Sequence, residues 1–413
     1  MLASRMLDSL IRVGSLKVID AGGQTHLFSG SEGPAVTVRL HDRTLHHRLF
    51  FNPSLALGEG YTDGTLTIED GAGLYKFLDL LGRNLEAAGR SGMGGIAGWL
   101  NRAFRRSQQF NPVGWARLNA ARHYDLSGAL YDLFLDSDKQ YSCAYFTDPN
   151  IDLDRAQQEK ERHIAAKLLL KPGQRVLDIG CGWGGLAIYL ATETGADVTG
   201  LTLSVEQLKV AERRACEAGL SDRVRFCLRD YREQTGAFDR IVSVGMFEHV
   251  GIDHYKRFFR QVHDLLAEDG VALLHTIGRI DGPGPTDPWI RKYIFPGGYI
   301  PALSEIMPAI EGTGLWTTDI EVLRLHYAET LRHWRQQFLA NRDKAAALFD
   351  ERFCRMWEYY LAISEITFRY LATAVFQIQL TKRQDAVPLV RDYVAEAKAR
   401  PVQPDRGTDS RAA

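Results

Sequence analysis

Between residues 174 and 275, short apolar runs alternate with amphipathic stretches in a regular order. Short apolar runs bounded by polar or turn residues predict buried strands, and apolar positions three and four residues apart predict helices. The expected strands are 175–179, 197–202, 224–228, 240–244 and 271–275, and the expected helices are 184–191 and 205–218. Strands and helices in this order predict an α/β fold with a mostly parallel, doubly wound, Rossmann-like sheet.

The first 85 residues have a different pattern, in which apolar and polar positions alternate in short runs, as at 35–40. This pattern predicts a smaller α+β unit with short strands. The glycines at 89–95 predict a linker or loop after it. We therefore expect an N-terminal domain at 1–110, a larger domain with helical insertions at 111–395, and a flexible tail at 396–413.

Long helices are expected to fill most of the segment from Tyr327 to Leu380. Its most hydrophobic part, Leu361–Leu380, carries polar side chains at positions 365, 369, 377 and 379. A bilayer span needs about 20 predominantly apolar residues. The stretch is therefore predicted to be a buried helix and not a membrane span.

Composition narrows the class of protein. The 413 residues are 45% hydrophobic and 24% charged, which excludes a disordered chain. The charges nearly balance, with 50 Lys and Arg against 51 Asp and Glu, so a nucleic-acid partner is not expected. The five cysteines are odd in number and form no CxxC pair, so neither a metal cluster nor a disulfide framework is predicted. The N-terminus does not resemble a signal peptide, which favours a cytoplasmic location.

A glycine-rich loop, Gly180-Cys181-Gly182-Trp183-Gly184-Gly185, joins the first expected strand to its helix. Glycines there let a ligand approach the backbone, as in dinucleotide-binding enzymes. A nicotinamide enzyme usually has an acidic residue about 20 positions further on, to hold a ribose hydroxyl. Here the second strand ends in Leu201-Thr202-Leu203-Ser204, without an acid. The run VLDIGCGWG instead resembles the first motif of S-adenosylmethionine-dependent methyltransferases.

This resemblance implies a set of residues around S-adenosylmethionine. Polar groups after the second strand are expected to bind the ribose, and residues at the end of the third strand are expected to contact the adenine. Two alternatives remain: Ser204 could only cap the following helix, and Asp230 could be an ordinary acidic loop residue. Two residues before the sheet are expected to close the pocket. The cofactor-binding set is Tyr141, Ser142, Asp178, Gly180, Gly182, Trp183, Gly184, Thr202, Leu203, Ser204, Gln207, Asp230 and Tyr231.

Several further segments resemble one family, the cyclopropane fatty acid synthases and the related mycolic acid cyclopropane synthases. They are YSCAYF at 141–146, GLTLSVEQ at 200–207, FEHVG at 247–251, LHTIG at 274–278, FPGGYIP at 295–301 and HYAETL at 326–331 with Trp334. Together with the glycine loop they cover roughly residues 120–385 in the family's order. Residues 1–110 resemble, less specifically, the N-terminal domain of the bacterial phospholipid-acting members.

The resemblance implies methyl transfer to an alkene, a carbocation, and ring closure after a base removes a proton. In this family the base is a bound bicarbonate. By resemblance its site comprises Cys143 and Ile277 through backbone groups, Glu248, His275 and Tyr327. Glu248 is expected to accept the bicarbonate proton and to orient His275, and Tyr327 to donate a hydrogen bond. Alone, each of these residues could equally be a packed core residue or a helix-terminal acid.

We therefore expect an enzyme that adds a methylene bridge across a cis double bond of a phospholipid acyl chain, with S-adenosylmethionine as cosubstrate. A methyl- or methylene-branched product is the alternative, and a catalytically silent lipid-binding protein is a rival that should lack Glu248, His275 or Tyr327. The aromatic residues Tyr141, Tyr145, Phe146 and Tyr299 are candidates for an acyl tunnel. The expected partner is unsaturated phospholipid at the inner membrane face, and the candidate contact surfaces are the basic, aromatic segment 99–106 and the loop at 89–97. An ordinary solvated helix face would explain the 99–106 pattern equally well. The N-terminal domain is expected to serve lipid docking or homodimer contacts.

Overall fold

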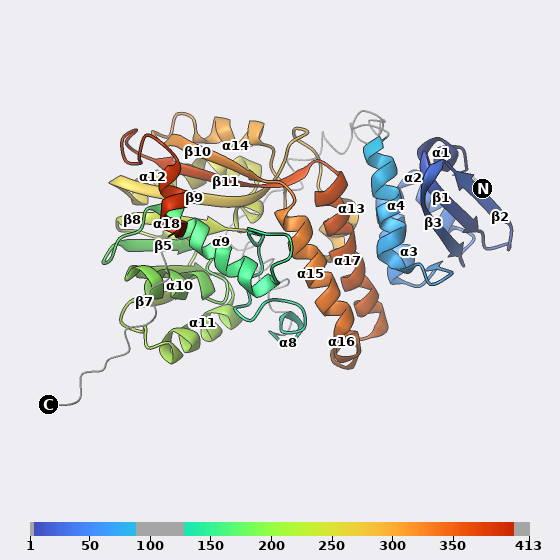
Figure 1. Ribbon diagram of the computed structural model, residues 1–413, viewed down its shortest axis with the longest axis horizontal. Helices are drawn as coiled ribbons and strands as arrows, with labels where there is room; N and C mark the ends of the chain where they lie inside the picture. The colour runs from blue at the N-terminus through green and yellow to red at the C-terminus, as the bar shows by residue number, and fades with distance from the viewer. Residues whose placement is uncertain (1–3, 88–127, 400–413) are drawn as a thin grey trace.

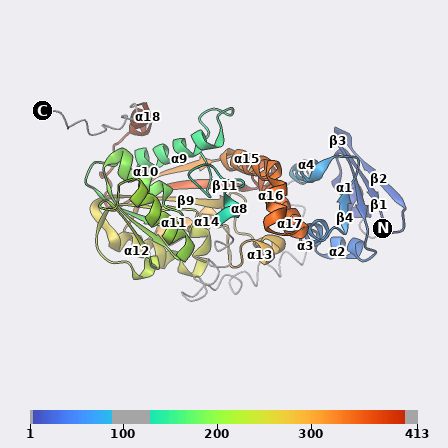
Figure 2. The ribbon, with the colours of Figure 1, turned by 90° about the horizontal axis from the view of Figure 1, so that it is seen from below.

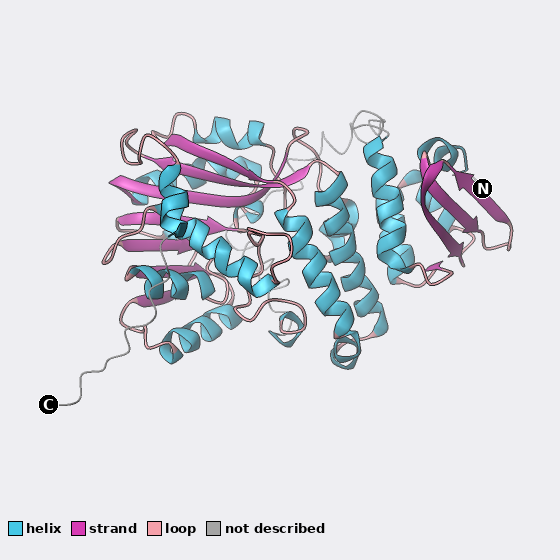
Figure 3. Cartoon of the chain, viewed as in Figure 1, coloured by secondary structure: helices cyan, strands magenta, loops and turns pink. Residues whose placement is uncertain are grey.

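The computed structural model describes residues 4–87 and 128–399. Its larger part is built on a seven-stranded sheet, drawn in magenta in Figure 3. The strands are β5 (Arg175–Ile179), β6 (Asp197–Thr202), β7 (Val224–Leu228), β8 (Phe238–Val244), β9 (Leu266–Arg279), β10 (Trp316–Leu323) and β11 (Thr373–Thr381). Each of the five predicted strands is present, and the predicted doubly wound α/β class is confirmed.

The strand order is β10-β11-β9-β8-β5-β6-β7. The strands β5 to β9 pair in parallel, while β11 runs antiparallel to both of its neighbours, β9 and β10. From β5 the chain moves first to β6 and β7 on one side and then to β8 and β9 on the other. Ligands bind outside the carboxyl ends of the strands at such a reversal, so the end of β5 is the expected place for a site.

Helices cover both faces of this sheet. On one face, α9 (Leu153–Leu168), α10 (Gly185–Thr194) and α11 (Val205–Glu217) share an apolar core with β5 and β6. On the other face, α12 (Tyr255–Leu265) and α14 (Leu303–Ile310) pack against β8, β9 and β11. Figure 2 shows α9 and α18 (Asp392–Ala399) on one side of β9 and β11, and α12 and α14 on the other. The central strands consist of continuous runs of apolar residues because both faces of the sheet are buried.

The remaining elements of the larger part are short or lie beyond the carboxyl edge of the sheet. They are α8 (Gly128–Tyr131), the 3₁₀ turns η1 (Tyr231–Glu233), η2 (Phe247–His249) and η3 (Ile252–His254), α13 (Pro288–Tyr293), α15 (His326–Ala340), α16 (Arg342–Leu348) and α17 (Glu351–Tyr370). In Figure 1 the long helices α15 and α17 stand side by side between the sheet and the N-terminal part of the chain.

The prediction of helices as far as Leu380 was wrong after Tyr370. Residues 373–381 form β11, inserted between β9 and β10. The run TAVFQIQLT is rich in β-branched and apolar residues and is buried along almost its whole length, as expected for a strand covered on both faces. A short apolar run does not by itself distinguish a buried strand from a buried helix.

The N-terminal part forms the predicted smaller α+β unit. Its four-stranded sheet has the order β2-β1-β3-β4, and its helices lie beside that sheet. The elements are α1 (Ser4–Leu10), β1 (Val13–Ile19), β2 (Thr25–Ser29), β3 (Ser31–Leu40), α2 (Leu45–Phe51), α3 (Pro53–Thr62), β4 (Leu66–Ile68) and α4 (Gly73–Ala87).

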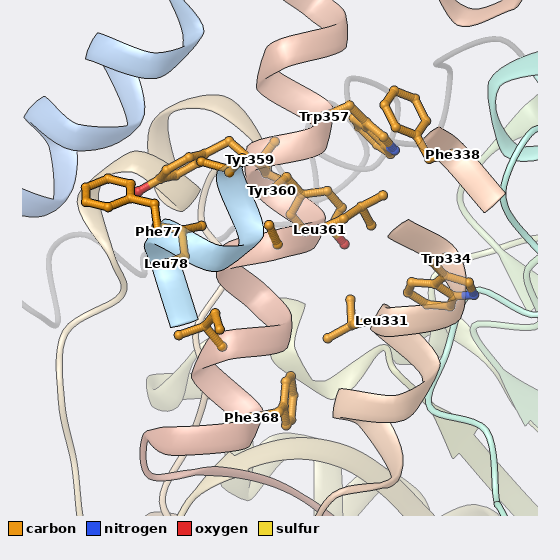
Figure 4. Close-up of a cluster of buried hydrophobic side chains, with 14 of the residues drawn as sticks. Phe77, Leu78, Leu331, Trp334, Phe338, Trp357, Tyr359, Tyr360, Leu361 and Phe368 are labelled. Atoms are coloured by element: carbon orange, nitrogen blue, oxygen red, sulfur yellow. The ribbon is translucent and has the colours of Figure 1, made fainter. Parts of the chain in front are cut away.

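The two parts meet through a shared apolar core. Phe77 and Leu78 of α4 lie beside α17, whose other side faces Leu331 and Trp334 of α15, as Figure 4 shows. A part-buried hydrogen bond also joins α4 to α17, because the Tyr370 hydroxyl donates to Asp79 Oδ1 at 2.6 Å. The helix α17 is therefore packed against the N-terminal unit on one side and α15 of the larger part on the other.

No helix among the described residues is long and apolar enough to cross a membrane. The predicted linker at 89–95, the predicted membrane-contact segment at 99–106 and the domain boundary at 110 lie outside the described residues. The expected tail begins inside α18, since that helix continues to Ala399, and the rest of the tail is also outside them.

Candidate active site

A cavity of about 180 Å³ lies at the carboxyl edge of β5, β6 and β7. Twelve of the thirteen residues expected around S-adenosylmethionine line it: Tyr141, Ser142, Asp178, Gly180, Gly182, Trp183, Thr202, Leu203, Ser204, Gln207, Asp230 and Tyr231. The cavity therefore lies where the strand order predicts a ligand site.

The glycine loop forms one wall of this cavity. The backbone N–H groups of Gly180 and Cys181 both donate to Leu201 O at 2.9 Å, which ties the loop to the end of β6. Gly180 has φ +88°, and a Cβ there would lie 2.8 Å from Met246 Cβ, so a side chain does not fit. Glycine at this position lets the turn after β5 stay tight and leaves backbone facing the cavity.

Gly184 is the one residue of the predicted cofactor set that does not line the cavity. It has φ +85° at the N-cap of α10, and a Cβ there would lie 2.6 Å from Phe226 Cζ and 2.9 Å from Ala211 Cβ. A glycine is required at position 184 so that α10 and α11 can pack closely on the sheet, and not to leave space for a ligand.

Asp178 places a buried carboxylate at the bottom of the cavity. It is 1% exposed, and its Oδ2 has no hydrogen-bond partner within residues 4–87 and 128–399. Burial raises the pKa of Asp178 to about 7, and the positive charge of Lys160 opposes that shift. An unpartnered acceptor in a ligand cavity is suited to a cationic group, such as the ammonium of a methionine moiety.

Lys160 is a further buried charge beside the cavity that the sequence analysis did not select. It lies on α9, is 0% exposed, and its Nζ donates to Ser142 Oγ at 3.2 Å and to Gln140 Oε1. Ser142 and Gln140 both line the cavity. Burial lowers the pKa of Lys160, and the neighbouring carboxylates of Glu161 and Asp136 oppose this. A lysine in a helix with many charges carries no signal in the sequence that separates it from a surface residue.

The polar residues after β6 form a small network. Ser204 is the N-cap of α11 and accepts from Gln207 N at 3.2 Å, while the Thr202 hydroxyl donates to Gln207 Oε1 at 2.8 Å. Both readings of Ser204 are therefore compatible with the structure, since it caps the helix and also lines the cavity. The network fixes two hydroxyls and an amide at the position where the fold predicts a ribose.

Asp230 follows β7 and caps the turn η1. Its two carboxylate oxygens accept from Arg232 Nε at 2.8 Å and Nη2 at 2.6 Å, a bidentate pair. Asp230 and Arg232 are both buried and both line the cavity. Asp230 is therefore held rigidly by its neighbour at the expected adenine end.

The five predicted catalytic residues do not line this cavity. They lie on β9, on the turn η2, at the start of α15 and on the segment before α9. Glu248 is 7% exposed, and its Oε1 accepts from the backbone N–H of Ile277 at 2.6 Å. The Ile277 N–H therefore orients Glu248, and a role of the Ile277 backbone toward an anion stays a prediction.

The second carboxylate oxygen of Glu248, Oε2, is buried and has no hydrogen-bond partner in the described part of the chain. Burial raises the pKa of Glu248 to about 7, and the Ile277 N–H opposes that shift. The loop FPGGYIP packs on the same turn, because Tyr299 N donates to Glu248 O at 2.9 Å. Glu248 is thus a fixed, water-excluded carboxyl group with one acceptor position open.

His275 is oriented by a residue that the sequence analysis did not select. Its Nδ1 lies 3.1 Å from Gln377 Nε2, across the β9–β11 pair, and no hydrogen bond joins it to Glu248. The expectation that Glu248 orients His275 is therefore not met. Gln377 could have been noticed because Gln377 and Gln379 alternate with apolar residues, the two-residue period of a strand.

Tyr327 and Cys143 are also buried, at 9% and 1% exposure. The Tyr327 ring packs between Phe368 and Trp334, at centroid distances of 4.7 and 5.7 Å. Cys143 lies in the segment YSCAYF, which is fixed to α15 because Ala144 N donates to Thr330 Oγ1 at 3.0 Å. The segment that carries Cys143 is thereby held against the helix that carries Tyr327.

Three of the four predicted tunnel aromatics have ring or hydrogen-bond partners outside the cofactor cavity, and their role in an acyl tunnel stays a prediction. Tyr145 stacks between His163 and His326, at 4.2 and 4.8 Å. The Tyr299 hydroxyl donates to Glu305. Phe146 stacks on His333 at 5.6 Å. Only Tyr141 of these four lines the cavity in the described residues.

Comparison with known proteins identifies the class of enzyme that has this fold and cavity. A solved mycolic acid cyclopropane synthase in complex with S-adenosylhomocysteine and CTAB superposes with a TM-score of 0.62 at 33% identity, covering 66% of this chain and 99% of that one. With its glycine loop at the end of β5 and a cavity of the expected residues, the chain is an S-adenosylmethionine-dependent methyltransferase.

Within that class, the model of the mycolic acid cyclopropane synthetase family matches residues 115–378, and the chain belongs to this family. A cyclopropane-fatty-acyl-phospholipid synthase of Escherichia coli K12 is 39% identical over 347 residues, which cover 84% of this chain and 87% of that protein. A probable fatty acid methyltransferase of Pseudomonas putida is 46% identical over 248 residues, covering 58% of this chain and 63% of that protein.

Proposed function

We propose that the protein transfers a methylene unit from S-adenosylmethionine to a cis double bond of a phospholipid acyl chain and forms a cyclopropane. The observation that carries this proposal is the presence of two buried, oriented side chains, Glu248 and His275. Glu248 accepts a hydrogen bond from Ile277 N, and His275 Nδ1 lies at hydrogen-bond distance from Gln377 Nε2. The 39% identity to the Escherichia coli phospholipid enzyme supports the substrate class, since that alignment is longer than the family-matched range.

The reaction proceeds in two bond-forming steps. The alkene attacks the sulfonium methyl, so a carbon–carbon bond forms while the carbon–sulfur bond breaks and sulfur keeps the electron pair. The other alkene carbon becomes a cation. Loss of one proton from the new methyl group then releases the electron pair that closes the three-membered ring, and S-adenosylhomocysteine is the second product.

The chain contributes orientation and exclusion of water to these steps. Glu248, His275 and Tyr327 are all at least nine-tenths buried, so water is kept from quenching the cation. Asp178 and the loop after β5 hold the cosubstrate, and Asp230 with Arg232 holds its adenine end. Aromatic rings near Tyr327 provide negative faces toward a cation.

Bicarbonate is the proposed base, and the polar atoms present suit it. Glu248 Oε2 and His275 Nε2 are both buried without a hydrogen-bond partner in the described residues, and buried polar atoms normally have one. A carboxylate accepts the hydroxyl proton of such an anion, and an imidazole N–H donates to its oxygen. When bound, bicarbonate would supply the base that removes the methyl proton. Cys143 and Tyr327 complete the proposed set.

A second product class has support of its own. The relative that is 46% identical is named a probable fatty acid methyltransferase. The same cation gives a methyl-branched alkene when it loses a proton from a chain carbon. It gives a methylene-branched chain when a hydride shift is followed by loss of a proton from the new methyl group. The methyl-branched product keeps all hydrogens of the transferred methyl group, so a labelled methyl separates it from the cyclopropane. The methylene-branched product loses one of them, as the cyclopropane does, and is separated from it by comparison with standards.

The test uses the purified full chain, S-adenosylmethionine with a trideuterated methyl group, and vesicles of a phospholipid with cis-monounsaturated chains. The released fatty acids are analysed by mass spectrometry against cyclopropane and branched standards. We expect a cyclopropane that retains two deuterium atoms. A methyl-branched chain with three, or a methylene-branched chain with two, would establish the second product class, and no modification despite bound S-adenosylmethionine would overturn both.

The membrane part of the proposal is tested in parallel. The same acyl chain is offered in vesicles and as a free fatty acid in detergent, and the initial rates are compared. We expect the vesicle rate to be higher, because the proposed substrate is phospholipid at the membrane surface. Equal or higher rates with the free acid would assign the enzyme to a soluble acyl substrate instead.

A further inference from the structure

We propose that Gln377 is a positioning residue that fixes His275 as the tautomer with its proton on Nε2. The two residues are direct partners in the antiparallel pairing of β9 and β11. Gln377 is 0% exposed and His275 is 2% exposed, so water does not compete for the hydrogen bond between them.

The tautomer follows from the orientation of the Gln377 amide, which has its NH₂ group toward the ring and its Oε1 buried without a hydrogen-bond partner in the described residues. Gln377 Nε2 is 3.1 Å from His275 Nδ1. An amide NH₂ group donates and does not accept, so Nδ1 of the imidazole must be the acceptor. A neutral imidazole carries one proton, and with Nδ1 occupied as an acceptor that proton is on Nε2.

The imidazole is neutral under ordinary conditions. Burial lowers the pKa of His275 to about 3, and the positive charges of Lys160 and Lys167 act in the same direction. The doubly protonated ring, in which both nitrogens donate, would also place a donor against the amide of Gln377. The hydrogen bond from Gln377 and the burial of the ring therefore both favour the neutral imidazole, and the hydrogen bond places its proton on Nε2.

The consequence for the reaction rests on the proposed function. In this tautomer Nε2 can donate to an anion but cannot take a proton from the substrate. Ile277, two residues further along β9, holds Glu248, so the strand carries a fixed donor and a fixed carboxyl group. His275 is then an anion-binding group, and Gln377 is the residue that makes it one.

The neighbouring Gln379 provides a matched control. It lies on the same strand, is 1% exposed, and is the same residue type. Its Nε2 donates to Lys167 O at 2.6 Å and to the Tyr393 hydroxyl at 2.8 Å, and its partner on β9 is Leu273, not His275. Replacing Gln379 by Met removes a buried amide of equal size without touching the predicted active site.

The first measurement is nitrogen NMR of the full chain with ¹⁵N-labelled histidine rings, with the signals of His275 assigned by comparison with His275→Asn among the 12 histidines. In the wild-type protein we expect a protonated-type signal for Nε2 and an unprotonated-type signal for Nδ1. In Gln377→Met we expect the two signals to move toward a tautomer average. In Gln379→Met they should remain at the wild-type positions.

The second measurement is steady-state kinetics on the same proteins. We expect Gln377→Met to lower kcat at least tenfold while the KM for S-adenosylmethionine changes less than twofold, since Gln377 does not line the cofactor cavity. Gln379→Met should keep kcat within about twofold of the wild type. The wild-type spectrum alone decides the tautomer if Gln377→Met does not fold.

Two results would overturn the inference: a protonated Nδ1 in the wild-type spectrum, or equal effects of Gln377→Met and Gln379→Met on both the spectrum and kcat. A failure of the proposed cyclopropane reaction would be detected by a different measurement, the analysis of the fatty acid product. A branched product, or no product, would remove the cyclopropane reaction and leave the tautomer of His275 measurable as before.

Discussion

The hydroxyls of Tyr141 and Tyr360 lie 2.7 Å apart, although 219 positions separate the two residues in the chain. Tyr141 lines the cofactor cavity, and Tyr360 lies on α17, the helix that also packs against the N-terminal unit. The neighbouring residue Tyr359 points the other way, toward Trp289 and Tyr61 of α3. The helix α17 thus connects the wall of the cavity to the N-terminal unit.

Replacing Tyr360 by Phe should weaken cofactor binding modestly. The change removes one hydrogen bond in a buried setting, which contributes about 1 kcal/mol. For a chain of 413 residues such a loss lowers Tm by about 1 °C. Because Tyr141 is in the cavity wall, we expect the Kd for S-adenosylmethionine to rise about two- to fivefold. Isothermal titration calorimetry measures the Kd, and differential scanning calorimetry measures Tm.

Tyr359→Phe is the control for that measurement. It removes the same hydroxyl from the adjacent position, on the side of α17 that faces the N-terminal unit. We expect its Kd for S-adenosylmethionine to equal that of the wild type. A Kd that rises equally in both variants would mean that α17 acts through general stability and not through the Tyr141 contact.

Replacing two glycines of the same loop by alanine should have different consequences, mainly on stability for Gly184 and mainly on cofactor binding for Gly182. A Cβ on Gly184 would overlap Phe226 and Ala211, and its φ of +85° disfavours any side chain. A Cβ on Gly182 meets no atom within 4 Å, and Gly182 lines the cavity. We expect Gly184→Ala to lower the free energy of unfolding by about 3 kcal/mol, and Gly182→Ala by about 1 kcal/mol.

Cofactor binding should separate the same two variants. Gly182→Ala places a methyl group where the cosubstrate is expected, so its Kd should rise at least tenfold, while folded Gly184→Ala should bind within about threefold of the wild type. Urea unfolding gives the stabilities and calorimetry the Kd values. Tight binding by Gly182→Ala would place the cosubstrate elsewhere in the cavity.

The parallel half of the fold could be predicted because its signals are local. Each strand from β5 to β8 is a short apolar run followed by a polar or glycine turn, and the loop after β5 carries three glycines with positive φ. The residues at the ends of those strands converge because carboxyl ends of parallel strands share one edge. Twelve of the thirteen expected cofactor residues therefore meet in one cavity, and Gly184, which packs α10, is outside it.

The partner of His275 could not be predicted by the same reasoning. Gln377 is 102 residues away in sequence, and it meets His275 only because β11 inserts antiparallel between β9 and β10. The interpretation of 361–380 as one helix removed that pairing from consideration. Nothing local distinguishes an apolar run that continues a helix from one that starts a central strand, since tertiary pairing decides between them.

Replacing Glu248 by Gln should abolish activity while leaving cofactor affinity nearly intact. Glu248 does not line the cofactor cavity, and the amide keeps the size of the carboxyl group and can still accept from Ile277 N. The amide cannot serve as a charged acceptor, so we expect kcat to fall at least a hundredfold. The Kd for S-adenosylmethionine should change less than twofold in calorimetry. An equal loss of binding and activity would assign Glu248 to the cofactor site.

The same substitution should change how stability depends on pH. Burial raises the pKa of Glu248 from 4.5 to about 7, so between these values the folded protein holds a proton that the unfolded chain releases. The contribution of Glu248 to stability is therefore complete below pH 4.5 and is lost as pH rises through about 7, a loss of about 3 kcal/mol. Gln at this position does not titrate. The free energy of unfolding of Glu248→Gln and of the wild type is measured with urea at pH 5.5 and pH 8. We expect the stability of the variant relative to the wild type to increase with pH. An equal difference at both pH values would show that the carboxyl group is ionised in the folded protein at both.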